Sequence, residues 1–209
     1  MSIRMFGKKV GMTQIFDREG FALPVTVINV KPCFVTQVKT QEKDGYNAIQ
    51  IGYFKCCPKK LNKPQLGLFK KYDLPPLSYL QEYRVTSTDH YVIGQAITIN
   101  DFNTGQFVNV TAKSIGKGFS GNQKRHKFKR GPMTHGSKNH RAPGSIGPGT
   151  TPGRVFPGKL MAGQLGAKQV HISNLEILGR DIHENVLILK GNIPGKSGNF
   201  LSLVRSEKL

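Results

Sequence analysis

The feature that most constrains this chain is a long segment with only one sign of charge. No Asp or Glu occurs between Asp101 and Glu176, while Lys and Arg recur through residues 116–158 among closely spaced Gly and Pro. The few apolar residues there follow neither a 3.6-residue nor a two-residue period, so neither an amphipathic helix nor a half-buried strand is predicted. Ordering a backbone costs roughly 1–2 kcal/mol per residue, which this composition cannot offset by burying apolar surface. We therefore expect the segment to form no hydrophobic core of its own, and to be ordered by a densely anionic partner such as folded RNA.

Net charge points to the same kind of partner. The 209 residues contain 31 Lys and Arg against 12 Asp and Glu, a formal charge of +19. The excess is uneven, because residues 1–112 hold 14 basic and 8 acidic side chains and residues 113–209 hold 17 and 4. This balance favours a nucleic acid over an acidic protein as the partner. The sequence has neither an apolar span of about 20 residues nor a basic amphipathic helix, which argues against a membrane partner.

Cysteine usage indicates a reducing compartment. Cys33, Cys56 and Cys57 are odd in number, and the last two are adjacent, so no disulfide framework is predicted. The N-terminal stretch MSIRMFGKKVGMTQIF lacks the apolar region of a signal peptide. We expect the chain to work in the compartment where it is made.

Most of the regular structure is predicted to be β. Strands are expected where β-branched and apolar residues alternate with polar ones between turn formers. The expected ranges are 10–16, 21–30, 33–40, 47–54, 79–85, 96–101, 107–114, 168–178, 185–190 and 199–204. Their spacing is typical of an antiparallel barrel or sandwich built from sequence neighbours. The globular body is then residues 1–112 and 160–209, with residues 113–159 inserted into it as an extended loop.

Residues 56–76 interrupt this pattern with a basic excursion. Pro64 is placed to begin a short helix, and Pro75 and Pro76 to stop it. The excursion carries five lysines that form either a solvated face or additional phosphate contacts, namely Lys59, Lys60, Lys63, Lys70 and Lys71.

Two glycine motifs raise the question of nucleotide binding. Residues 116–121 match G-x-G-x-x-G after an expected strand, but no Asp or Glu lies about 20 residues further on, and Pro132 interrupts the helix that should follow. Residues 191–197 resemble a phosphate loop with one residue too few, and a hairpin loop explains them better. Histidines on the segment suggest a metal, but no neighbouring carboxylate can orient an imidazole, and no nucleophile has an adjacent base. The sequence therefore predicts no cofactor, no metal and no catalytic residue.

The residues expected to bind RNA all lie on the inserted segment. Lys and Arg can neutralise phosphates, His and Phe can stack on unpaired bases, and Gly lets the backbone approach closely. The candidates are Lys113, Lys117, Lys124, Arg125, His126, Lys127, Phe128, Lys129, Arg130, His135, Lys138, His140, Arg141, Arg154 and Lys159.

The same segment resembles the signature of a known family. GKGFSGNQKRHKFKRGPMTHGSKNHRAPGSIG and TPGRVFPGKLMAGQLG are similar to the third protein of the large ribosomal subunit, ribosomal protein L-three, in its bacterial and plastid form. GKKVGMTQIFD near the start and NLEIL and PGKSGN near the end match as well, so the resemblance covers nearly the whole chain.

The resemblance implies both a fold and a role. The fold is a distorted β-barrel like those of translation factors, with short helices and a long basic Gly/Pro-rich extension inserted in it. The role is that of a non-enzymatic constituent of the large ribosomal subunit, which binds ribosomal RNA near its 3′ end and helps to nucleate assembly. The loop reaches toward the peptidyl transferase centre, with its tip within residues 130–146 or at residues 148–154.

Partners and location follow from the same resemblance. The partners are large-subunit ribosomal RNA and neighbouring ribosomal proteins, with no membrane, no small-molecule substrate and no second copy of the chain. The location is the ribosome, in the plastid stroma or otherwise in the bacterial cytoplasm.

Two alternatives of other classes remain open from the residues. A nucleotide-binding enzyme would use residues 116–121, and saturable binding of a mononucleotide would reveal it. A general nucleic-acid-compacting protein would bind duplex DNA as well as ribosomal RNA, and a competition titration separates the two.

Overall fold

The computed structural model describes residues 4–206 and divides the chain into two compact units. Unit 1 consists of the chain up to Lys113 and from Gln169 onward, and unit 2 is Ser114–Lys168. Residues 1–3 and 207–209, which belong to the body expected from the sequence, lie outside the described range. Unit 2 continues past Lys159, because residues 163–168 pair with residues 114–120.

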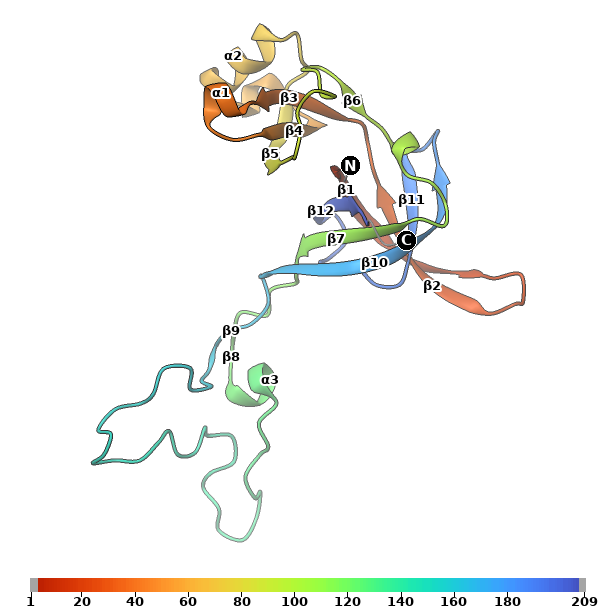
Figure 1. The fold of residues 1–209 in the computed structure, drawn as a ribbon. Coiled ribbons are helices and arrows are strands. Elements are labelled where there is room, and N and C mark those ends of the chain that lie inside the picture. Colours follow the sequence, from red (N-terminus) through yellow and green to blue (C-terminus); the bar gives the residue numbers. More distant parts are fainter. Residues whose placement is uncertain (1–3, 207–209) are drawn as a thin grey trace. The chain divides into compact units, whose positions relative to one another are not determined.

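Unit 1 contains a closed antiparallel barrel with the strand order β1-β12-β7-β10-β11-β2 (Figure 1). The prediction of a mainly β protein with a barrel and short helices is confirmed. Closure lets the strands satisfy their backbone groups within the barrel. The barrel strands are β1 (Arg4–Phe16), β2 (Ala22–Asn29), β7 (Phe107–Lys113), β10 (Gln169–Asp181), β11 (Val186–Lys190) and β12 (Phe200–Arg205).

Alternating side chains fill the barrel interior. Along β7, β11 and β12, every second residue is buried and the intervening ones are exposed or half-buried. This is the two-residue period that predicted the strands. Each aliphatic side chain taken fully out of water contributes about 1.5–3 kcal/mol. The buried residues of these strands are Val108, Val110, Ala112, Leu187, Leu189, Leu201 and Leu203.

Four other strands form a second sheet with the order β5-β4-β3-β6. The expectation of one barrel or sandwich built from sequence neighbours is therefore wrong where β2 is followed by β3. At that point the Val30 N–H donates to Asn185 O at 2.7 Å, and Pro32, which has no N–H to give to a ladder, follows two residues later. The strands of this sheet are β3 (Cys33–Lys39), β4 (Ala48–Lys55), β5 (Leu77–Arg84) and β6 (Ala96–Ile97).

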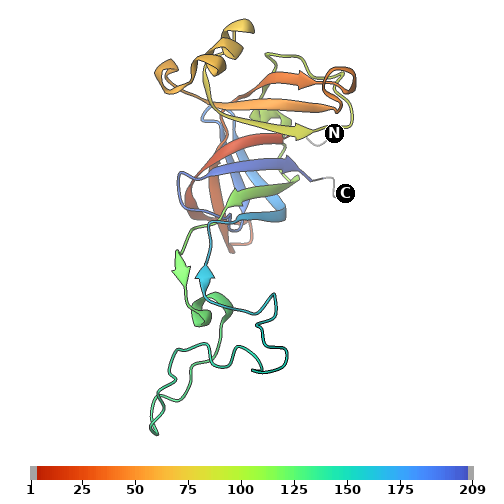
Figure 2. The same ribbon diagram turned by 90° about the vertical axis from the view of Figure 1, so that its left-hand side faces the viewer.

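Within unit 1 the second sheet lies beside the barrel (Figure 2). Aromatic rings join it to the outer face of the barrel. Phe6 of β1 lies 6.5 Å, centroid to centroid, from Tyr53 of β4, and stacks on Phe200 of β12 at 5.1 Å. Tyr79 of β5 stacks on the same Phe200 ring at 4.8 Å. Phe6 and Tyr53 are each 1% exposed and belong to a cluster with residues of both sheets, so the two sheets share one hydrophobic core.

The helices of unit 1 are short and lie in connections between strands. They are α1 (Gln41–Asp44), α2 (Lys63–Lys71) and two 3₁₀ turns, Pro58–Lys60 and Ile99–Asp101. The helix expected at Pro64 is confirmed, and Asn62 and Gln65 form a capping box at its start. It ends at Lys71, before the two prolines that were expected to stop it. Among the described residues, no helix has the length and apolar content to cross a bilayer.

The connection between β11 and β12 corrects a second expectation. It is no hairpin loop, because β11 pairs with β10 and β2 whereas β12 pairs with β1 and β7. The Lys9 ammonium secures this connection by donating to the backbone oxygens of Ile193 (2.7 Å) and Gly195 (3.2 Å). Burial lowers the pKa of Lys9, and the two carbonyls compensate part of the lost hydration.

Truncating a barrel leucine tests where the hydrophobic core lies. We expect Leu189→Ala to reduce the free energy of unfolding by about 2–5 kcal/mol, because Leu189 is 0% exposed and its loss leaves a cavity. Leu160→Ala is the matched control, since Leu160 of unit 2 is 48% exposed and should cost little. Urea denaturation followed by far-ultraviolet circular dichroism measures both. Equal losses in the two variants would contradict this location of the core.

Thiol labelling tests the burial of β3. Cys33 is buried, Cys56 is half-buried and Cys57 is exposed. Burial raises the pKa of Cys33 to about 12, so its thiol stays protonated and unreactive near neutral pH. We expect iodoacetamide to modify Cys57 first, and Cys33 only after a denaturant is added. Peptide mass spectrometry reads the sites, and modification of Cys33 in the folded chain would contradict the placement of β3.

Candidate nucleic-acid interface

The inserted segment interrupts two neighbouring barrel strands. Lys113, the last residue of β7, pairs with Gln169, the first residue of β10. Within unit 2 the two legs of the segment continue to pair, since the Ser114 N–H donates to Lys168 O at 2.9 Å and β8 (Phe119–Ser120) pairs with β9 (Gly163–Gln164). The insertion therefore starts and ends as an antiparallel ribbon.

Two side chains brace the legs from within unit 2. Arg125, on α3 (Asn122–His126), donates from Nη1 to Met161 O at 2.5 Å, and His126 Nε2 lies 3.0 Å from the same oxygen. Gly163 lies close to this guanidinium, since a Cβ there would be 2.7 Å from Nη1 and the Arg125 side chain would have to shift. Arg125 and His126 were candidates for RNA contact, and the structure shows that each also has a partner inside the chain.

A second candidate histidine, His140, holds the loop that follows α3. His140 Nδ1 lies 2.9 Å from Pro132 O, and the Gly131 N–H donates back to His140 O at 3.1 Å. Residue 131 must be glycine, since a Cβ would collide with Asn139 O. Polar contacts to the backbone thus set the path of this loop.

Unit 2 has no hydrophobic core, as the sequence predicted. Ser120 and Asn122 are its buried residues, and neither is apolar. Large apolar side chains are exposed instead, including Phe119 (79%), Met133 (61%) and Phe156 (55%). The rings can stack on bases, and the guanidinium of Arg154 already lies 5.7 Å from the centroid of the Phe156 ring.

The candidate cations are presented to solvent. Of the fifteen candidates, Arg125, His126, Phe128 and His140 are half-buried. The exposed candidates are Lys113, Lys117, Lys124, Lys127, Lys129, Arg130, His135, Lys138, Arg141, Arg154 and Lys159.

The charge of unit 2 is not compensated within the chain. Residues 114–168 contain eleven Lys and Arg and no Asp or Glu. In the part of the chain that the structure describes, both ion pairs lie in unit 1, Lys39–Glu82 at 2.7 Å and Lys190–Glu176 at 3.2 Å. A chain segment of this kind attracts a polyanion strongly and in a salt-dependent way.

Lys168 and Phe156 also belong to this surface, although neither was among the sequence candidates. Lys168 is exposed and lies in unit 2, but the sequence assigned it to a strand of the body. Phe156 was counted as an apolar residue of the segment and not as a stacking ring. Its position two residues after Arg154 is the signal that could have identified it, because arginine and an aromatic ring are the usual pair on single-stranded RNA.

The glycine motif at residues 116–121 lies in a setting that does not fit a dinucleotide. Its fifth residue is the second residue of β8, the strand before it is antiparallel to both of its neighbours, and the helix after it has five residues. A dinucleotide fingerprint needs a parallel strand–helix–strand unit. Among residues 4–206, no His, Cys, Asp and Glu side chains are grouped as metal ligands would be.

Comparison with known proteins gives the family. The family model described as "Ribosomal protein L3" matches residues 82–180. "Large ribosomal subunit protein uL3c" of Phaeodactylum tricornutum is 56% identical over 206 residues, which cover 99% of this chain and all of the relative. The chain belongs to the ribosomal protein L3 family.

Other members of the L3 family indicate the type. The uL3c of Porphyra purpurea is 59% identical over 203 residues, 97% of this chain and 99% of the relative. The uL3 of Picosynechococcus sp. is 56% identical over 208 residues, 99% of this chain and 98% of the relative. The predicted family, its plastid or bacterial type and a location on the ribosome of a plastid or bacterium are thus confirmed.

Replacing either of two neighbouring cations on α3 by alanine distinguishes a residue that holds the two legs together from one that is only exposed to solvent. We expect Arg125→Ala to raise hydrogen exchange at the amides of Lys117 and Leu165, which bond across the two legs, by roughly fivefold. The cause is loss of the Arg125 contact to Met161 O. Lys124→Ala is the control, because Lys124 is exposed and makes no such contact. Equal exchange in both variants would show that Arg125 does not brace the legs.

Proposed function

We propose that this chain is a structural constituent of the large ribosomal subunit that binds large-subunit ribosomal RNA directly, mainly through unit 2. The observation that carries the proposal is a compact unit with eleven cations, no acidic residue and no hydrophobic core. Such a unit is complementary to densely packed phosphates and to little else. The names of the relatives, which are proteins of the large ribosomal subunit, support it.

The residues of unit 2 contribute to RNA binding in different ways, according to their chemistry. Phosphate neutralisation by exposed lysines and arginines supplies most of the affinity, because every neutralised phosphate releases counterions. Exposed rings such as Phe119 and Phe156 stack on unpaired bases. Arg125, His126 and His140 hold the loop in a shape that fits between RNA helices. Recognition is then mainly of RNA shape, with stacking fixing the register.

The finer assignments rest on the family resemblance. Unit 2 penetrates the RNA toward the peptidyl transferase centre, with its tip at residues 130–146 or 148–154. Unit 1 lies near the 3′ end of the large-subunit RNA and contacts neighbouring ribosomal proteins, and the complex forms early in assembly. The role is structural and not enzymatic. Competition between duplex DNA and ribosomal RNA distinguishes this function from general nucleic-acid compaction.

Removing four exposed cations tests the proposal through the salt dependence of binding. We expect Lys124, Lys127, Lys129 and Arg130, all changed to Gln, to lower the slope of log K against log salt by about 3, at roughly 0.7–0.9 per phosphate contact. The same variant should assemble poorly into subunits while its unit 1 unfolds as in the wild type. Filter binding at several salt concentrations gives the slope.

The matched control removes four exposed lysines from unit 1. Lys59, Lys60, Lys63 and Lys70 are all exposed, and changing them to Gln removes the same charge. We expect them to form a solvated face, so that the slope changes little. An unchanged slope in the unit 2 variant, or equal changes in both variants, would contradict the assignment of RNA binding to unit 2.

A further inference from the structure

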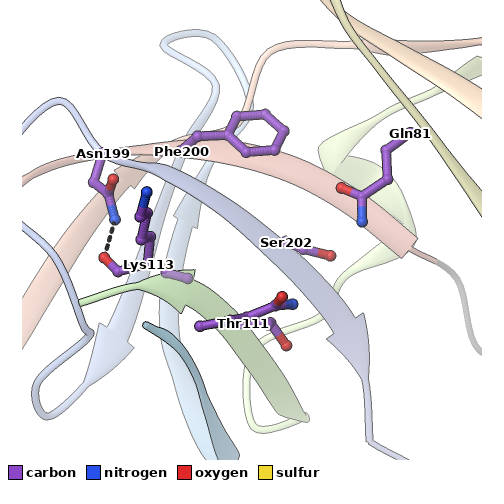
Figure 3. A pocket seen from close by; sticks show the side chains of 8 residues that line it. Gln81, Thr111, Lys113, Asn199, Phe200 and Ser202 are labelled. Atoms are coloured by element: carbon purple, nitrogen blue, oxygen red, sulfur yellow. Dashed lines mark hydrogen bonds between the residues drawn. The ribbon is translucent and has the colours of Figure 1, made fainter. Parts of the chain in front are cut away.

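A hollow on the outer face of the barrel is not explained by the role proposed for unit 2. It has a volume of about 470 Å³ and is formed entirely by unit 1 (Figure 3). Thr111 and Lys113 on β7 and Phe200 and Ser202 on β12 point outward, because the residues between them fill the barrel interior. Gln81 of β5 reaches in from the second sheet. The hollow therefore opens where the second sheet ceases to cover the barrel.

One wall of the hollow is rigid and aromatic. The Phe200 ring stacks on Phe6 at 5.1 Å with 26° between the planes, and on Tyr79 at 4.8 Å with 21°. Phe6 is almost fully buried, which anchors the stack in the core. A ring held in this way cannot fold into the hollow and fill it, so the space remains open to a ligand.

Apart from Lys113 and Ala112, the remaining lining consists of neutral hydrogen-bonding groups, several of them unused. Asn199 Nδ2 donates to Lys113 O at 2.9 Å, which leaves the Asn199 side-chain oxygen available (Figure 3). Within the described part of the chain, the side chains of Gln81 and Ser202 have no hydrogen-bond partner. Amides and hydroxyls both donate and accept, which is the pattern required by the edge of a nucleobase.

Charge around the hollow is positive. Lys113 lines it. No Asp or Glu is among the residues that line it. A hydrogen-bonding floor beside a lysine fits a base with its phosphate better than a neutral peptide segment, which would bring no negative charge for Lys113 to meet.

We propose that this hollow binds a single unpaired nucleotide that is turned out of the stack of the RNA. The base lies against the edge of the Phe200 ring, whose two faces are covered by Phe6 and Tyr79. The hydrogen-bonding edge of the base meets Gln81, Ser202 and the Asn199 oxygen, and its phosphate meets Lys113. The volume is within the roughly 300–1,000 Å³ typical of small-ligand pockets. The proposal rests on the RNA-binding function above, but it assigns sequence-reading contacts to unit 1, whereas unit 2 reads shape and charge.

Filling the hollow without changing charge tests the proposal. We expect Ser202→Phe to weaken binding of large-subunit RNA by the full-length chain about tenfold, and to lower the salt slope by no more than the roughly 0.7–0.9 of one phosphate contact, because the displaced nucleotide loses its base contacts and at most its phosphate contact to Lys113. Ser78→Phe is the matched control on the exposed, opposite face of β5, and should bind as the wild type does. Thermal unfolding of both variants confirms the fold. Wild-type affinity in a folded Ser202→Phe chain would overturn the proposal.

Crosslinking gives a second measurement that does not depend on filling the hollow. A photoreactive benzophenone amino acid replaces the exposed Gln81, and the full-length chain is irradiated with large-subunit RNA and in assembled subunits. A crosslink concentrated at one unpaired nucleotide supports the site. Dispersed crosslinks, or a crosslink to a neighbouring protein in the subunit, overturn it while the RNA-binding function stands. Failure of the wild-type chain to bind the RNA at all would remove the function and the site together.

Discussion

The pairing of β7 with β10 is the constraint on which the rest of the molecule depends. These strands are neighbours in the closed barrel, so the chain that leaves Lys113 must return to Gln169, one strand spacing or about 5 Å away. Any insertion at this position can be long without disturbing the core, because its ends are already fixed and the closure entropy grows only slowly with length. The barrel therefore tolerates 55 inserted residues (114–168) that bring it no hydrophobic contacts of their own.

This arrangement separates two physical roles that usually compete within one domain. Unit 1 holds the hydrophobic core and both ion pairs of the described residues. Unit 2 concentrates eleven like charges, which repel one another and would destabilise a core if they surrounded one. Its path is held by contacts that need no apolar surface, such as Arg125 and His126 on a single backbone oxygen and glycines at points of close approach. A polyanion then supplies what the chain lacks.

The strands could be predicted from the sequence because their signal is local. Alternation such as Val108, Val110 and Ala112 repeats every two residues, and most expected ranges lie within a few residues of those observed. The exceptions are β1, which begins six residues earlier than expected, and the short β8 and β9, which were not expected. The division into two sheets could not be predicted, because it depends on which strands pair. β3 pairs with β4 and β6 and not with the preceding β2, and β12 pairs with β1 and β7, which are distant from it in sequence. The same limit explains why residues 191–197 were mistaken for a hairpin loop.

In the candidate interface, the sequence predicted the chemistry of Lys124 and Arg130 from composition alone. It could not predict the contact of Arg125 with Met161 O, because the two residues are 36 positions apart and a local pattern contains no information about such a pair. The hollow beside Phe200 combines residues from β5, β7 and β12, and it too becomes visible only once the fold is known.

The open legs and loops of unit 2 also bear on how a cell matches the supply of this chain to that of its partner. Eleven lysines and arginines lie on a backbone that has few internal hydrogen bonds and no core, which is the kind of segment that proteases cleave most readily. In the proposed complex, burial of the same segment in RNA removes it from their reach. On that proposal a copy made in excess of the RNA is short-lived and an assembled copy is durable, so the charge that recruits the partner also limits the lifetime of the chain without it.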